Sequence, residues 1–175
     1  MFRLATVDDV EAIAALHTHS WRENYRGIYS DAFLDNEATA DRLEVWSQRL
    51  RAPVRDQFTT VGEVEGSLVG LAHVILDEDP IRGAVVQNLH VHTNVQRKGI
   101  GTALLSEVAQ ALQQRRPASR LHVWVREDNT SAMAFYEALQ GTRVDRKLGG
   151  PFADGSRAPV LCYWWANPGN LLTSR

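Results

Sequence analysis

The sequence predicts a mixed α/β protein with several consecutive strands at its centre. Helical and strand-like patterns alternate along the 175 residues, and the middle of the chain is rich in β-branched and apolar residues. A turn signal at Glu65-Gly66-Ser67 separates two of the central strands as in a hairpin. We therefore expect a strand, two helices, three strands, a helix, a strand, a helix and two strands.

The composition is that of an ordinary globular chain. Hydrophobic residues make up 44% and charged residues 23%, which excludes wholesale disorder. A chain of 175 residues has the length of one domain, so residues 1–175 are expected to form a single domain. Lys and Arg number 19 and Asp and Glu 21, a net charge of −2, which lacks the basic excess of a nucleic-acid-coating protein.

The cysteine content and the apolar runs limit which cellular compartment and which kinds of metal site are expected for the chain. Cys162 is the one cysteine, which excludes an internal disulfide and a cysteine-based zinc site. The first residues lack the pattern of a secretory signal, and every apolar run is far shorter than the roughly 20 residues of a membrane span. We expect a cytoplasmic protein with no metal, no membrane partner and no nucleic-acid partner.

The first third of the chain predicts a short strand and two helices. Residues 2–5 form the strand, and Thr6 with Asp9 has the pattern of a capping box. The apolar positions that follow at helical spacing are Val10, Ile13 and Leu16. They predict a helix to about residue 21, with a frayed end and loop over residues 20–27. The second helix is expected around Leu43, Trp46 and Leu50.

The middle of the chain predicts three strands. Residues 58–64 and 68–76 flank the hairpin turn, and the acidic residues 77–80 are expected to form a loop. Residues 84–92 form the third strand. The side chains on one face of that strand are Val85, Gln87, Leu89 and Val91.

The last part of the chain predicts two helices and three strands. Apolar residues from Ile100 onward repeat every four positions, which predicts a helix that Pro117 ends. Residues 121–125 form a strand and residues 129–139 a helix. The closing strands are expected at residues 142–146 and 160–165.

The segment Gln96-Arg97-Lys98-Gly99-Ile100-Gly101 lies between a strand and a helix and suits an anion. Glycines let backbone N–H groups approach a ligand closely, and the helix N-terminus adds N–H donors and partial positive charge. The alternative is a tight turn with solvated basic side chains. A Walker A pattern is absent, and Leu104 stands where a dinucleotide loop needs a small residue. These observations favour the pyrophosphate of a cofactor with an extended arm.

These residues resemble the acetyl-CoA motif of the GNAT-type N-acetyltransferases. Leu89-His90-Val91 followed by Gln96 to Gly101 matches the family pattern Q/R-x-x-G-x-G/A after a strand. The family's N-x-x-A-x-x-F-Y-E helix is matched by Asn129, Ala132, Phe135, Tyr136 and Glu137, and its first-helix ending by Ser20-Trp21-Arg22. The resemblance covers nearly the whole chain. It implies a GNAT fold, a mixed and mostly antiparallel central sheet of about seven strands flanked by about four helices.

The resemblance also implies roles for individual residues. The backbone groups of Leu89 and Val91 would pair with the pantetheine arm and acetyl group of acetyl-CoA, and Asn129 would contact the same arm. The residues expected to hold the pyrophosphate are Gln96, Arg97, Lys98, Gly99, Ile100, Gly101 and Thr102. Tyr136 would protonate the leaving thiolate. The acceptor would be a primary amine of a small molecule or peptide.

Several alternatives stay open at the level of sequence. The strand face that carries Val85 and Gln87 offers no base. The alternatives are His90, His92, a water relay, or an acceptor amine that arrives already deprotonated. An acidic residue at 127 or 128 would suit an NAD-type oxidoreductase, and the missing base would suit a non-catalytic acyl-CoA sensor.

Two aromatic groups also have two interpretations each. Trp21, Tyr25 and Tyr29 would form either part of the amine pocket or a seal over the core. Trp164 and Trp165 alternate across a strand, so one is expected in the core and the other is available to a homodimer interface.

Overall fold

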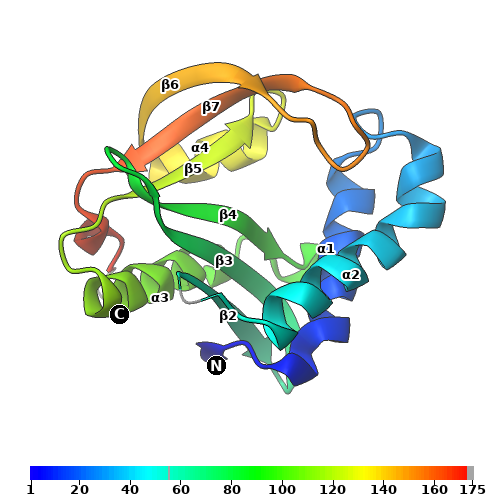
Figure 1. Ribbon diagram of the computed structural model, residues 1–175, viewed down its shortest axis with the longest axis horizontal. Helices are drawn as coiled ribbons and strands as arrows, with labels where there is room; N and C mark the ends of the chain where they lie inside the picture. Colours follow the sequence, from blue (N-terminus) through cyan, green and yellow to red (C-terminus); the bar gives the residue numbers. More distant parts are fainter. Residues whose placement is uncertain (55, 173–175) are drawn as a thin grey trace. The chain divides into compact units, whose positions relative to one another are not determined.

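The computed structural model describes residues 1–54 and 56–172, and these contain four α-helices and seven strands in the predicted order (Figure 1). The helices are α1 (Val10–Asn24), α2 (Ala38–Arg51), α3 (Ile100–Arg115) and α4 (Thr130–Ala138). The strands are β1 (Phe2–Leu4), β2 (Gln57–Val64), β3 (Ser67–Asp79), β4 (Gly83–Val91), β5 (Leu121–Arg126), β6 (Thr142–Gly149) and β7 (Ala158–Trp165).

The strands form one sheet in the order β1-β2-β3-β4-β5-β7-β6. β1 pairs antiparallel with β2, and β7 pairs antiparallel with both β5 and β6. β4 and β5 pair in parallel, at Ala84 and Val85 of β4. The expected mixed and mostly antiparallel sheet with four helices is confirmed.

Contacts divide the chain into two compact units, which are described separately below. Unit 1 comprises Met1–His73 and Asn88–Leu104, and unit 2 comprises Val74–Gln87 and Leu105–Arg175. The expectation of a single domain over residues 1–175 stays a prediction.

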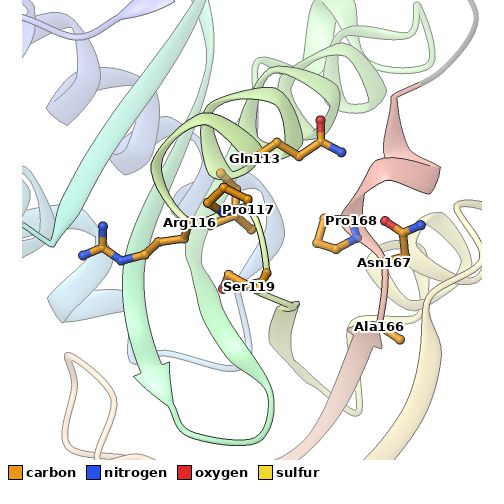
Figure 2. A pocket seen from close by; sticks show the side chains of 9 residues that line it. Gln113, Arg116, Pro117, Ser119, Ala166, Asn167 and Pro168 are labelled. Carbon is orange, nitrogen blue, oxygen red and sulfur yellow. The ribbon is translucent and has the colours of Figure 1, made fainter.

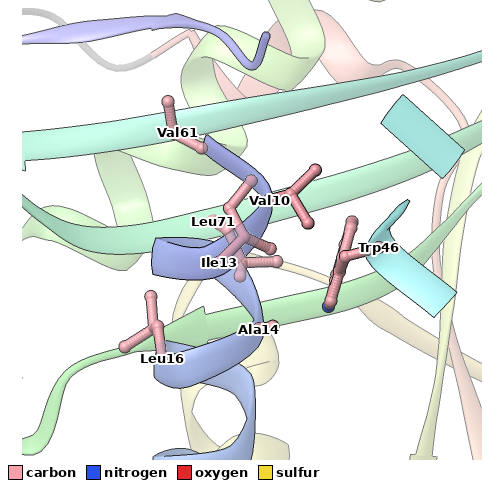
Figure 3. Packing of buried hydrophobic residues seen from close by; sticks show 7 residues of the cluster. All are labelled: Val10, Ile13, Ala14, Leu16, Trp46, Val61 and Leu71. Carbon is pink, nitrogen blue, oxygen red and sulfur yellow. The ribbon is translucent and has the colours of Figure 1, made fainter. Parts of the chain in front are cut away.

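The core of unit 1 lies where α1 and α2 cover the strands. Its buried side chains are Val10, Ile13, Ala14, Leu16, Trp46, Val61 and Leu71 (Figure 3). Val10, Ile13 and Leu16 are the α1 residues whose spacing predicted that helix, and Trp46 from α2 lies beside them. The predicted capping box of Thr6 and Asp9 is present, and a 3-10 turn at Val7–Asp9 leads from it into α1.

In unit 2, α4 packs on β7 through aromatic rings. The ring of Tyr136 lies 5.8 Å from that of Tyr163 and 6.0 Å from that of Trp165. The indole of Trp165 donates to the carbonyl of Leu139 at 2.8 Å. Trp165 is therefore the core tryptophan, whereas Trp164 is half-buried with the guanidinium of Arg120 5.7 Å from its ring centre. The homodimer stays a prediction.

Two element boundaries in the first half of the chain were predicted wrongly. α1 continues to Asn24, so residues 20–24 are helical and not a loop. β3 continues to Asp79 because its acidic end is neutralised within unit 2: Arg116 pairs with Asp77 at 2.7 Å and Arg82 with Asp79 at 2.9 Å.

The remaining differences concern one side chain and the closing strands. Leu43 is 41% exposed, so it does not share the buried side of α2 with Trp46. β6 and β7 are also longer than predicted, because their register extends to the pair Gly149 and Ala158.

A small hollow of about 180 Å³ lies in unit 2, where the end of α3 meets the residues that follow β7. Figure 2 shows Pro117 and Ser119 facing Asn167 and Pro168 across it, with the guanidinium of Arg116 directed away. None of the predicted site residues lines this hollow. Among the described residues, no helix is long and apolar enough to cross a membrane, and no three metal-binding side chains gather.

Candidate active site

The loop between β4 and α3 has the backbone of an anion cradle. After a 3-10 turn at Thr93–Val95, Arg97 and Gly99 take positive φ angles of 59° and 82°. A Cβ on Gly99 would have nothing within 4 Å, so glycine is favoured there by its backbone angle and not by lack of room. α3 then begins at Ile100, and its first N–H groups have no acceptor within the helix.

The side chains of this loop fall into two kinds. Arg97 and Lys98 are exposed and supply positive charge beside the helix end. Gln96 is used differently, since its side-chain amide donates to the carbonyl of Val91 at 3.1 Å. Gln96 therefore ties the start of the loop to the end of β4, and the two glycines follow at positions 99 and 101.

In unit 2, α4 presents the two other predicted residues. The side-chain oxygen of Asn129 accepts from the N–H of Ala132 at 3.1 Å, so Asn129 caps the helix. Tyr136 is buried, and its ring meets Phe135, Tyr163 and Trp165. The structure thus gathers Leu89, Val91 and the loop in unit 1, and Asn129 and Tyr136 on one helix of unit 2.

Three histidines of unit 1 form a group that the sequence did not indicate, and we call His17, His73 and His90 the histidine array. His17 and His73 contact the ring of Trp46, and His90 packs on His17. Trp46 donates to Nδ1 of His17 at 3.0 Å. An indole only donates, so His17 carries its proton on Nε2. Oγ1 of Thr59 lies 2.8 Å from Nδ1 of His73. His17 follows Ile13 by four residues on the buried side of α1, and this spacing is the signal that could have revealed it.

The third member of the array, His90, lies on β4 between Leu89 and Val91. Oγ of Ser20 lies 2.9 Å from its Nδ1, and its ring centre lies 4.1 Å from that of His17. Burial first, and the charge of Arg42 second, lower the pKa of His90 to about 4. Burial also lowers the pKa of His73 to about 3 and holds that of His17 well below its usual value. All three rings are therefore neutral at pH 7.

The aromatic residues at the end of α1 pack on one another. Trp21 and Tyr29 are buried with ring centres 5.2 Å apart, and Tyr25 stacks on Tyr29 at the same distance. The guanidinium of Arg42 already lies 4.2 Å from the Trp21 ring. Trp21 is thus a core residue, and Tyr25 is the more accessible ring of the cluster.

The lowered pKa values predict that mild acid destabilises the protein. An unfolded histidine has a pKa of about 6.5. Below that pH the unfolded chain binds more protons than the folded one, so stability falls as the pH drops toward the folded values of about 4 and about 3. Each fully buried histidine accounts for up to about 1.4 kcal/mol of lost stability per pH unit. Urea unfolding at pH 7.5 and at pH 5 measures this difference.

A His73→Gln variant provides the matched control, because it removes one buried titrating ring. Its stability should depend less on pH over the same interval. The carboxyl of Asp9, whose pKa the Arg3 guanidinium lowers to about 2, does not titrate there. Equal stability of the parent protein at the two pH values would show that the histidines are not held neutral.

Comparisons with known proteins converge on one family. Residues 12–141 match the sequence model described as the acetyltransferase (GNAT) family. An uncharacterized N-acetyltransferase of Bacillus subtilis, YuaI, is 31% identical over 144 residues, which cover 81% of this chain and 80% of that protein. A probable N-acetyltransferase of Mycobacterium tuberculosis is 28% identical over 77% of this chain and 75% of its own length.

Solved structures share the fold. The PaiA N-acetyltransferase of Thermoplasma acidophilum, determined in complex with coenzyme A, superposes with a TM-score of 0.69 at 18% identity, covering 94% of this chain and 98% of that one. A ribosomal-protein-alanine N-acetyltransferase of Brucella melitensis gives a TM-score of 0.68 at 21% identity, covering 94% and 98%.

Proposed function

The chain belongs to the GNAT acetyltransferase family and is therefore an acyltransferase, and we propose that it transfers an acetyl group from acetyl-CoA directly to a primary amine of a small molecule or peptide. The observation that carries the proposal is the loop between β4 and α3. It combines the left-handed Gly99, two exposed cations and a helix N-terminus in one short segment. Such a segment fits a pyrophosphate.

The residues proposed to hold the cofactor follow from this loop. The N–H groups from Arg97 to Thr102 would bind the pyrophosphate, and Lys98 would add charge without a fixed partner. The backbone of Leu89 and Val91 would pair with the pantetheine arm, since both residues lie beyond the part of β4 that pairs with β5. One lone pair of the Val91 carbonyl is already engaged by Gln96. The thioester supplies an acetyl group that is activated for attack by an amine.

Tyr136 and Asn129 are proposed to act from α4. A phenol hydroxyl can protonate a departing thiolate as a general acid. Asn129 keeps its side-chain N–H groups for the pantetheine arm, because its capping bond uses only the oxygen. The cytoplasmic location stays a prediction from the sequence.

The oxidoreductase alternative loses its supporting residues. Arg146 pairs with Glu127 at 2.8 Å, and Arg126 pairs with Asp128 at 2.8 Å. Both carboxylates are thus engaged by arginines of unit 2, which leaves neither as an evident partner for a ribose.

Coenzyme A is expected to raise the melting temperature, whereas NADH is not. A ligand that binds only the folded state stabilises it by about 2.7 kcal/mol at one hundred times its Kd. For a chain of this size that shift amounts to roughly 5–10 °C. Thermal melting with each compound measures it, and a shift with NADH alone would contradict the proposed function.

Turnover separates an enzyme from an acyl-CoA sensor. The parent protein is mixed with acetyl-CoA and a panel of amines, and free thiol is followed with time. An enzyme releases thiol only when a suitable amine is present. Binding of coenzyme A without thiol release for any amine would favour the sensor.

A further inference from the structure

One face of β4 in unit 1 is directed at the helices α1 and α2 through alternate side chains. Asn88 accepts from the Arg49 guanidinium of α2 at 2.8 Å. His90 meets Ser20 of α1, and the ring of His92 stacks on that of His19 at 4.5 Å. His90 is the middle residue of this row. It is also flanked in sequence by Leu89 and Val91, whose backbone is proposed to bind the acetyl end of the cofactor.

The imidazole of His90 is held from two sides and leaves one nitrogen open. Ser20 is buried, and its hydroxyl lies 2.9 Å from Nδ1 of His90. The ring of His17, itself fixed by Trp46, packs 4.1 Å away on another side. Nε2 of His90 has no hydrogen-bond partner in the described part of the chain, and the side chain is only half-buried. Nε2 is therefore the nitrogen that the packing of the array leaves unengaged.

The charges that face His90 keep the ring neutral. From α1, the ring of His17 and the uncharged hydroxyl of Ser20 face His90. From α2, the positive charge of Arg42 lowers the pKa of His90. No carboxylate contributes to its pKa, which the buried setting and Arg42 hold at about 4. A neutral imidazole has one lone pair to offer, and the direction of the hydrogen bond with Ser20 goes with the nitrogen that offers it, since the hydroxyl can accept an Nδ1–H or donate to an unprotonated Nδ1.

We propose that Nε2 of His90 takes the proton from the acceptor amine, and that Ser20 is a positioning residue that accepts the Nδ1–H of His90 and so leaves Nε2 unprotonated. The inference rests on the proposed function and names the base that the sequence left open. In the step, the amine nitrogen bonds to the acetyl carbon, and the bond from that carbon to sulfur breaks. The amine proton passes to His90 and then to water. The thiolate takes a proton from Tyr136, whose phenolate regains a proton from water.

His90→Asn tests the base directly. The amide of asparagine replaces Nδ1 and can still donate to Ser20, but nothing replaces Nε2. We expect kcat to fall by roughly 10²–10⁴-fold, as for other lost acid–base groups. KM for acetyl-CoA and the melting shift with coenzyme A should stay within twofold of the parent. A folded His90→Asn variant with the parent's kcat would overturn the proposal.

Ser20 is tested by a pair of variants. Ser20→Ala removes the partner of Nδ1, and we expect kcat to fall about tenfold, the worth of one hydrogen bond. Ser20→Thr keeps a hydroxyl and should recover most of this loss. A role in packing alone predicts the opposite order, because alanine fits the space of serine and threonine adds a methyl group.

A measurement on the parent protein keeps the test independent of variant folding. Long-range ¹H–¹⁵N correlation spectra at pH 7 report which nitrogen of His90 carries the proton. The proposal requires Nδ1–H in the parent and a shift toward Nε2–H in Ser20→Ala. Nε2–H in the parent would make that nitrogen a donor and would overturn the assignment.

The outcomes separate this inference from the proposed function. If the parent releases thiol with an amine while His90→Asn does so equally fast, only the base assignment fails. If His92→Asn rather than His90→Asn loses kcat, the base is the neighbouring histidine. If the parent binds coenzyme A and acetylates no amine, the proposed function fails and the base assignment with it.

Discussion

Gly101→Asp is expected to leave the protein folded and to abolish its affinity for coenzyme A. Gly101 is the second residue of α3, and the first turn of this helix contains no acidic residue. A carboxylate in the first turn interacts favourably with the helix dipole, so the helix itself should tolerate the change. The same carboxylate occupies the N–H groups that a pyrophosphate would need, and it repels the phosphates. We expect a loss of at least about 100-fold in affinity, or about 2.7 kcal/mol.

Titration calorimetry with coenzyme A on the folded variant measures this loss. Gly101→Ala is the matched control, because it adds a Cβ without a charge and separates crowding from repulsion. We expect it to bind more tightly than Gly101→Asp. Parent-like affinity in Gly101→Asp would show that the loop is only a turn between β4 and α3.

Tyr136→Phe is expected to lower kcat by roughly 10²–10⁴-fold while the fold and the affinity for coenzyme A remain. The phenyl ring is retained, so its contacts with Tyr163 and Trp165 should persist. Only the hydroxyl is lost, and its proposed task is to protonate the thiolate in the transition state. KM for acetyl-CoA should therefore change little.

Tyr163→Phe is the matched control for this experiment. Tyr163 belongs to the same aromatic cluster, but its hydroxyl donates to Glu137 at 2.6 Å, and burial raises its pKa to about 12. Its loss should reduce stability and leave kcat near that of the parent. A Tyr136→Phe variant as fast as the parent would identify Tyr136 as a packing residue, with water or another group protonating the thiolate.

Much of the fold was predictable because the relevant signals are local. Helical spacing in α1 and α3, the capping box at Thr6 and the glycine of the β2–β3 turn each act within a few residues. The structure places Glu65 and Gly66 at φ angles of 50° and 76°, the left-handed pair that a two-residue hairpin turn requires. The boundary that failed at Asp79 depends on a partner elsewhere in the chain, since Arg116 pairs with Asp77 at the end of β3.

The backbone of the loop between β4 and α3 was predictable for the same reason. A glycine with positive φ followed by a helix N-terminus is a property of consecutive residues, and Gly99 and Ile100 satisfy it. The task of Gln96 was not predictable, since it depends on the carbonyl of Val91 lying within reach of its amide. The hydrogen bond by which Asn129 caps α4 is also local. The sequence alone did not show that Asn129 has this capping role beside the cofactor contact expected of it.

By itself, the sequence determined the order of the elements, the glycine-containing turn into α3 and the membership of a family, because these depend on spacing along the chain. Only the tertiary structure decided that His17 and His73 meet at Trp46, that His90 packs on His17, and that Ser20 reaches His90. These residues come from α1, α2, β3 and β4, and Ser20 and His90 alone stand 70 positions apart in the chain. A histidine's pKa and its open nitrogen are set by burial and by neighbours in space, and neither is encoded in the residues beside it.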